Sequence, residues 1–213
     1  MFKAMLFDLD GTIGDTLPLC IAAFRAAIEP LSGKKLKDAD IIATFGPSEE
    51  GTIMAFIPDQ YDRGVEAYID NYRKLHDMCP EPFPGMRETL DFLKGRGVFL
   101  AMVTGKGRRS ADITLERFAL GDYFADVGVG DPKGECKALR ITEILDKRGI
   151  APADAVYVGD TPSDIMSARK AGVAVFSAAW AGTADIPALE ELGPDKIFTS
   201  VAEFRRYLGD MLS

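Results

Sequence analysis

The chain has 213 residues, which suffices for one sizeable hydrophobic core or for a core with a modest inserted domain. Its 25 basic and 33 acidic side chains give a formal net charge of −8, which disfavours nucleic acid as a partner. Because the sequence also shows no signal peptide and no apolar run of the roughly 20 residues that would span a membrane, we expect a cytoplasmic globular protein. We expect this protein to be a monomer or a homodimer.

An apolar run near the N-terminus ends in two aspartates, Asp8 and Asp10. Such a run is typical of a central parallel strand, whose carboxyl end is the usual ligand crevice of an α/β fold. Alternate strand residues point the same way, so both carboxylates would leave the sheet together, and their repulsion favours a divalent cation such as Mg²⁺ between them. The alternative is that Asp8 caps a turn and Asp10-Gly11 is an ordinary turn dipeptide. This segment alone does not separate the two interpretations.

Residues 17–78 show apolar side chains at helical spacing and no convincing strand. We expect helices there over Leu17–Ile28, Asp38–Ala43, Glu49–Phe56 and Asp62–Asp77, separated by Pro30–Gly33, Gly46-Pro47 and Pro58-Asp59. Three prolines within residues 79–85 cannot continue a helix. The pattern predicts a small all-helical domain over residues 16–79, inserted into a core formed by residues 1–15 and 80–213.

From Val98 onward, short β-rich runs alternate with amphipathic stretches. The expected strands are Val98–Val103, Val127–Val129, Ala155–Val158, Val173–Phe176 and Lys196–Phe198. The expected helices are Met86–Lys94, Arg109–Phe118, Cys136–Arg148, Ser163–Lys170, Ile186–Leu192 and Val201–Leu212. Short strands joined by helices predict an α/β fold in which a doubly wound parallel sheet is covered on both faces.

The cysteines and the single histidine limit the chemistry. Cys20, Cys79 and Cys136 are odd in number and widely spaced, which favours buried or incidental thiols over disulfides or a zinc site. A Ser-His-Asp or Cys-His mechanism would depend on His76 alone, since the sequence has no other histidine. Carboxylates are therefore the better candidates for proton transfer.

Two later strands also end in polar groups. Thr104 precedes Gly105-Lys106-Gly107, whose amides could face an anion, although alone this is a plain turn and not a nucleotide P-loop. Asp160 ends another strand, and Asp164 stands one helical turn further on. Ordinary helix capping would explain Asp164 without a metal, but it explains Asp160 less well.

Taken in order, these motifs resemble those of the haloacid dehalogenase superfamily. They are Asp8-Leu-Asp10-Gly-Thr12, Thr104-Gly-Lys106, a lysine before a helix, and Gly159-Asp160-Thr-Pro-Ser-Asp164. The resemblance covers the whole chain and is strongest to members of the phosphoglycolate phosphatase and β-phosphoglucomutase type. It implies a helical cap after the first strand and a Mg²⁺-dependent phosphatase that acts on a small phosphorylated metabolite.

The resemblance also implies roles for individual residues. Asp8 would be the nucleophile that forms an aspartyl-phosphate, and Asp10 the general acid and base. Mg²⁺ would be bound by the side chains of Asp8 and Asp160 and by the backbone carbonyl of Asp10, with Asp164 holding the coordination sphere. The phosphate would be bound by Asp8, Gly11, Thr12, Thr104, Gly105, Lys106 and Lys137. Two of these residues, Thr104 and Lys137, would also be catalytic, together with Asp8 and Asp10.

The motif lysine has two candidates, Lys133 and Lys137. Lys137 is preferred because it directly precedes the expected helix and stands at a family-like distance from Asp160. Lys133 lies in a Gly-Asp-Pro-Lys-Gly loop and could be a solvated turn residue. Either lysine would balance the charge of phosphate and of Asp8.

The substrate is not decoded by the sequence. The cap loop Thr44–Glu50 stands where relatives place specificity residues, yet it is equally readable as a Gly-Pro turn in which Ser48 and Glu49 start a helix. Phosphoglycolate is a plausible substrate, and a phosphomutase or pyrophosphatase is the alternative enzyme. A receiver-like switch phosphorylated on aspartate is the alternative outside enzymes, but it would lack Asp10 and the helical insert.

Overall fold

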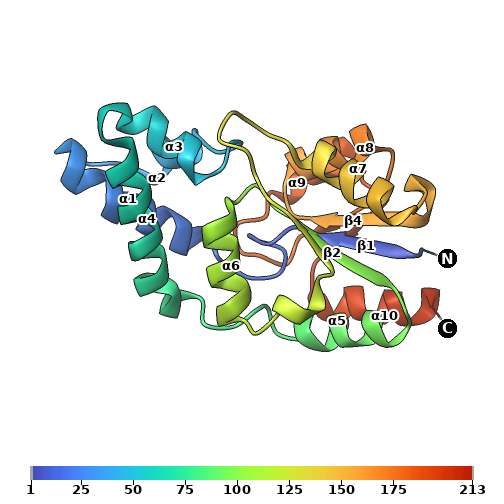
Figure 1. Ribbon diagram of the computed structural model, residues 1–213. Coiled ribbons are helices and arrows are strands. Elements are labelled where there is room, and N and C mark those ends of the chain that lie inside the picture. Colours follow the sequence, from blue (N-terminus) through green and yellow to red (C-terminus); the bar gives the residue numbers. More distant parts are fainter. Residues whose placement is uncertain (1, 213) are drawn as a thin grey trace.

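The computed structural model describes residues 2–212, which form a parallel six-stranded sheet flanked by helices (Figure 1). The strands are β1 (Ala4–Phe7), β2 (Phe99–Val103), β3 (Asp126–Gly128), β4 (Ala155–Gly159), β5 (Ala174–Ala178) and β6 (Lys196–Phe198). Their order is β3-β2-β1-β4-β5-β6, so β1 is central and pairs with both β2 and β4. The predicted parallel sheet is confirmed.

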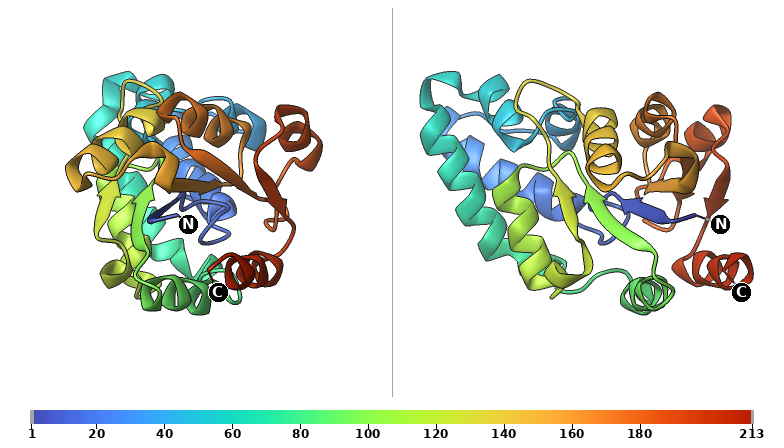
Figure 2. Two further views of the ribbon diagram at one scale, coloured as in Figure 1. Left: turned by 90° about the vertical axis from the view of Figure 1, so that its right-hand side faces the viewer. Right: turned by 45° about the vertical axis from the view of Figure 1, so that its right-hand side comes forward.

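Helices cover both faces of the sheet (Figures 1 and 2). On one side lie α5 (Met86–Gly95), α6 (Arg108–Arg117) and α10 (Val201–Met211), and on the other α7 (Lys137–Arg148), α8 (Pro162–Ala171) and α9 (Ile186–Leu192). Successive side chains of β1 point to opposite faces of the sheet, so this strand contributes to the hydrophobic core on each face. Met5 and Phe7 pack toward the first set of helices, and Ala4 and Leu6 pack toward the second. This arrangement confirms the doubly wound α/β fold.

Helices alone make up the segment between β1 and α5. They are α1 (Leu17–Ser32), α2 (Asp38–Ile42), α3 (Glu49–Phe56) and α4 (Tyr61–Leu75), with 3₁₀ turns at Pro58–Gln60 and His76–Met78. They lie together at one end of the molecule (Figure 2) around a third hydrophobic cluster that includes Phe24, Tyr68 and Tyr72. Ile113 of α6 completes that cluster, so the insert packs directly on a helix of the sheet layer.

Helix α1 is longer than predicted. We expected it to end at Ile28, before Pro30, but it continues to Ser32. Pro30 lies inside the last turn, where its missing N–H removes one bond from the helical ladder without ending the helix. Gly33, in the left-handed conformation with φ 68°, ends the helix and donates its N–H to the Glu29 carbonyl.

The fold brings three strand ends beneath the helical insert. Because the sheet is parallel, the carboxyl ends of β1, β2 and β4 lie side by side at one edge, and the insert stands over that edge (Figure 1). None of the helices within residues 2–212 combines the length and apolar character needed to cross a bilayer.

Candidate active site

The loop after β1 places two carboxylates in the crevice. Asp8 directly follows the strand, donates its N–H to the Val158 carbonyl at 2.9 Å, and is 4% exposed. Gly11 turns the chain with φ +77°, and a Cβ there would come within 2.1 Å of Asp160 Oδ2. Glycine is therefore required for this close approach, in which the Thr12 hydroxyl donates to Asp160 Oδ1 at 3.1 Å.

Asp164 has two roles at once. As the third residue of α8 it accepts the Thr161 N–H at 2.9 Å and the Thr161 hydroxyl at 2.6 Å, which is a capping box. Its other oxygen lies 2.6 Å from Lys137 Nζ and 3.2 Å from the Tyr157 hydroxyl. Helix capping and membership of a charged cluster, which the sequence presented as alternatives, are thus both present.

Lys137 joins a carboxylate that follows β1 to one in the first turn of α8. Its Nζ lies 2.6 Å from Asp8 Oδ2 as well as 2.6 Å from Asp164 Oδ1, and the side chain is buried. Burial alone would lower the pKa of Lys137, but the Asp164 and Asp8 charges outweigh it and raise that pKa above its usual value. Lys133, in contrast, is exposed in its loop.

Asp8, Asp160 and Asp164 form an acidic cluster, with carboxylate oxygens within 4.8 Å of one another. Burial, opposed by Lys137 and reinforced by Asp164 and Asp10, raises the pKa of Asp8 to about 7. The pKa of Asp160 is also well above its ordinary value, chiefly because of burial and then because of its two acidic neighbours. One lysine does not compensate three carboxylates, and a set of carboxylate oxygens is what a hard divalent cation binds.

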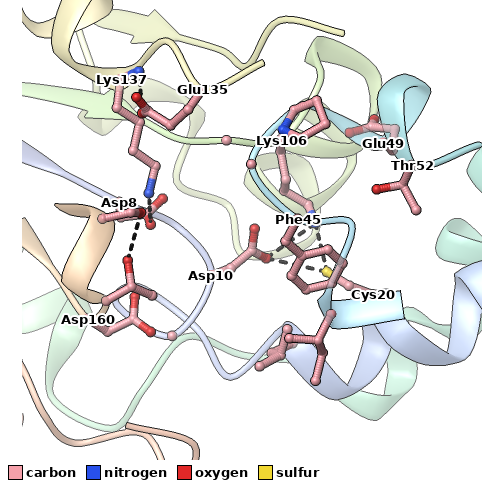
Figure 3. A pocket seen from close by; sticks show the side chains of 18 of the residues that line it. Asp8, Asp10, Cys20, Phe45, Glu49, Thr52, Lys106, Glu135, Lys137 and Asp160 are labelled. Carbon is pink, nitrogen blue, oxygen red and sulfur yellow. Dashed lines mark hydrogen bonds and ion pairs between the residues drawn. The ribbon is translucent and has the colours of Figure 1, made fainter. Parts of the chain in front are cut away.

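Asp10 belongs to a second group of side chains, opposite the first in the pocket (Figure 3). Its carboxylate accepts a hydrogen bond from Thr16 and lies 3.2 Å from Lys106 Nζ. The same ammonium lies 3.0 Å from Cys20 Sγ and 4.3 Å from the centre of the Tyr72 ring. Burial, followed by the Asp10 charge, raises the pKa of Cys20 to about 12, so this thiol stays protonated at neutral pH.

Both groups line one cavity of about 290 Å³ between the sheet edge and the insert. The insert contributes mostly apolar side chains, together with Glu49 and Thr52 at the start of α3. Glu49 reaches across to the core, where its carboxylate accepts the Gly107 N–H at 2.6 Å and the Ser110 hydroxyl at 2.7 Å. The arrangement can hold a phosphoryl group at Asp8 and place its leaving group beneath the insert.

The sequence matches the family described as haloacid dehalogenase-like hydrolase over residues 5–178. This chain belongs to that family. A protein from Caldanaerobacter subterraneus assigned as the pyrophosphatase PpaX is 36% identical, with 83% of this chain and 81% of that protein covered. Phosphoglycolate phosphatase of Chromobacterium violaceum is 30% identical, with 94% of each chain covered.

A solved structure gives the same result for the fold. The haloacid dehalogenase-like hydrolase SP0104 from Streptococcus pneumoniae superposes with a TM-score of 0.79 at 26% identity and covers 97% of this chain and 98% of its own. The family predicted from the motifs is confirmed, and the chain is a hydrolase of the phosphatase type within the haloacid dehalogenase-like family.

Most, but not all, of the predicted site residues of this haloacid dehalogenase-like hydrolase line the cavity. Those that do are Asp8, Asp10, Gly11, Gly105, Lys106, Lys137 and Asp160. Asp164 belongs to the acidic cluster next to the cavity, and Thr12 donates a hydrogen bond to Asp160. Thr104 is 1% exposed, and its hydroxyl accepts the Lys106 N–H at 3.2 Å. The ammonium of Lys106, predicted to bind phosphate, pairs with Asp10 in this structure.

Sequence reasoning did not find the partners of Asp10. Thr16 and Cys20 lie one turn apart at the start of α1, and a threonine or lone cysteine there reads as ordinary helix composition. For Glu49 the sequence left two interpretations open, a specificity residue of the cap loop or the start of a helix, and neither includes its contact with α6. The sequence carries no signal for this contact, because the burial of Ser48 and Glu49 is visible only in the fold.

Proposed function

We propose that this chain is a Mg²⁺-dependent phosphomonoester hydrolase that works through an aspartyl-phosphate on Asp8. The observation that carries the proposal is the placement of Lys137 between Asp8 and Asp164, with Asp10 in the same cavity but outside the acidic cluster. Two carboxylates two residues apart in sequence thus have separate surroundings, which suits a nucleophile and a proton carrier.

The acidic cluster fits Mg²⁺ by its chemistry. Asp8, Asp160 and Asp164 offer only oxygen donors, and burial, reinforced by the neighbouring carboxylates, raises the pKa values of Asp8 and Asp160. We infer that Asp8, Asp160 and the Asp10 carbonyl hold the ion and that Asp164 orients the site. When bound, the ion would neutralise repulsion between the Asp8 carboxylate and the phosphoryl group.

The chain's own residues account for both chemical steps. An Asp8 oxygen attacks phosphorus, the bond from phosphorus to the alcohol oxygen breaks, and protonated Asp10 gives its proton to that oxygen. A water molecule then attacks phosphorus, Asp10 takes its proton, and the bond from Asp8 to phosphorus breaks. Lys137 steadies the Asp8 carboxylate and the transferred group, and the amides around Gly105 offer further donors.

We assign residues 16–79 the role of a cap that covers the leaving group. Support comes from the cavity lining, which draws on α1 to α4 for one wall and on the strand ends for the other. The relatives are named for phosphoglycolate and for pyrophosphate, so likeness alone suggests these two substrates. A phosphomutase is the second candidate enzyme, and a receiver-like switch is disfavoured because Asp10 would speed loss of the phosphoryl group.

Phosphate release from a panel of small phosphomonoesters tests the proposal, with and without Mg²⁺ and with Asp8→Asn as the matched variant. We expect turnover only for the wild type with metal. Turnover retained in Asp8→Asn would overturn the covalent mechanism, and isomerisation of a sugar phosphate faster than phosphate release would favour the mutase. Binding of Mg²⁺ is followed separately by thermal unfolding, where Asp160→Asn should lose the shift seen in the wild type.

A further inference from the structure

The cavity is unevenly charged. Five acidic residues line it, Asp8, Asp10, Glu49, Glu135 and Asp160, but only two lysines, Lys106 and Lys137. The part near Asp8 receives the phosphoryl group, so the remaining part must accommodate the alcohol that leaves. The chemistry of that second part selects the substrate.

Both lysines are already paired. Lys137 is held between Asp8 and Asp164, each at 2.6 Å from its Nζ. Lys106 is 6% exposed and pairs with Asp10 while also contacting Cys20 and the Tyr72 ring. A substrate anion that drew Lys106 away would leave the Asp10 carboxylate without its cation in a buried setting, which is costly.

The start of α6 is also filled. A helix N-terminus is a favourable place for a substrate anion, because its free N–H groups point outward. Here the Gly107 N–H and the Ser110 hydroxyl both donate to the carboxylate of Glu49, a residue that is 4% exposed. An anionic leaving group would therefore meet a buried negative charge at the place where other sites offer donors.

The wall formed by the insert is mostly apolar. Besides Cys20, Glu49 and Thr52, it contributes six apolar or aromatic side chains, Leu17, Phe24, Ile42, Phe45, Pro47 and Tyr68. Phe24 stacks on Tyr68 with ring centres 4.2 Å apart, and Phe45 lies 6.1 Å from Phe24. Phe45 and Ile42 remain 39% and 45% exposed, so this wall carries apolar surface that a substrate can cover. No arginine or lysine of residues 16–79, all of which the structure describes, lines the cavity.

We propose that the substrate is a phosphate monoester of a neutral alcohol with an apolar portion, and that leaving groups carrying a carboxylate or a second phosphate are selected against. The proposal deepens the phosphatase function and rests on it. It departs from the two substrates for which the relatives are named, phosphoglycolate and pyrophosphate, because their leaving groups, glycolate and phosphate, are anions. Thr52, which also lines the cavity, is a neutral polar residue whose hydroxyl accepts a hydrogen bond from Thr44 at 3.1 Å.

Matched substrates test the inference. Phosphoglycolate is compared with its carboxamide, which has the same shape but no leaving-group charge, and both are compared with benzyl phosphate and pyrophosphate. We expect kcat/KM for the carboxamide and benzyl esters to exceed that for phosphoglycolate and pyrophosphate by at least about tenfold. Phosphoglycolate or pyrophosphate hydrolysed as well as the neutral esters would overturn the inference. Hydrolysis of none of them, and of no member of the wider phosphomonoester panel, would instead overturn the phosphatase function.

A charge-installing variant tests the cause. Phe45→Lys places a cation at the rim of the cavity, and Met54→Lys is the control, because Met54 is a 48% exposed apolar residue of α3 that does not line the cavity. We expect Phe45→Lys to lower the ratio of kcat/KM for the carboxamide to kcat/KM for phosphoglycolate about tenfold. Ile42→Lys, a second variant in the same wall, should have the same effect. Met54→Lys should leave the ratio unchanged. A ratio unaffected in both cavity variants, with folding verified by circular dichroism, would overturn the inference.

Discussion

The Lys106 ammonium lies 3.2 Å from the Asp10 carboxylate, within a buried group that also contains Thr16 and Cys20. Lys106 follows β2, whereas Thr16 and Cys20 belong to the junction with the insert and to α1. The proposed proton carrier is therefore oriented from the core and from the insert together. We infer from this contact that Lys106 is a positioning residue for Asp10; the phosphate binding expected from the sequence motif stays a prediction.

Lys106→Met should separate these two roles. If Lys106 orients Asp10, kcat falls by about 10- to 100-fold with KM little changed, because the proton carrier is misplaced but phosphate binding is intact. If Lys106 binds phosphate, KM rises instead. Steady-state kinetics on one phosphomonoester distinguish the outcomes, and Lys133→Met, a change at an exposed loop lysine, is the control.

The choice of motif lysine is tested by alanine substitutions. Lys137→Ala leaves the Asp8 and Asp164 carboxylates buried without their shared cation, so we expect at least about a 100-fold loss of kcat and a protein less stable by about 3 kcal/mol. Lys133→Ala should stay within about twofold of the wild type, as expected of an exposed side chain. Kinetics and urea unfolding measure both effects. Loss of turnover in Lys133→Ala alone would show that the motif lysine is the other one.

Two glycines form a matched pair for testing the loop after β1. Gly11 and Gly33 have similar left-handed backbones, with φ of +77° and +68°, but a Cβ on Gly11 would collide with Asp160 whereas none of the described atoms lies within 4 Å of one on Gly33. Gly33→Ala should cost only the backbone strain, about 1 kcal/mol. Gly11→Ala should lose at least about 3 kcal/mol and the stabilisation by Mg²⁺, because Asp160 must move. Equal losses in the two variants, measured by urea unfolding, would show that the close approach is not needed.

Much of the fold and part of the site could be predicted from the sequence. Strand ends are visible as apolar runs that stop at polar residues, so Asp8, Asp10 and Asp160 could be placed at one edge of a parallel sheet. The pairing of Lys106 with Asp10 and of Glu49 with α6 could not. Both join segments that are distant in sequence, and side-chain direction at a loop or a helix start has no periodic signal.

His76 lies where the insert meets the sheet layer and gives a pH prediction. The ring is buried, with Tyr72 and Phe118 at its edges, and its Nε2 lies 3.0 Å from the Thr114 hydroxyl of α6. Burial lowers the pKa of His76 below its ordinary 6.5, and the positive charges of Lys106 and Arg117 act in the same direction. As the pH falls, His76 therefore stays neutral in the folded state at pH values where it is already partly protonated in the unfolded chain.

The sign of the effect follows from proton linkage. Well above pH 6.5 neither state holds the proton, so His76 makes no pH-dependent contribution, and as the pH falls to 6.5 and below the unfolded chain binds the proton first. The unfolding free energy of the wild type, measured with saturating Mg²⁺, should therefore fall relative to that of His76→Asn as the pH drops below 6.5. The slope is limited to about 1.4 kcal/mol per pH unit for one proton. Because the chain has a single histidine, its ring signal in NMR reports the folded pKa directly, and titration at or above 6.5 would contradict the prediction.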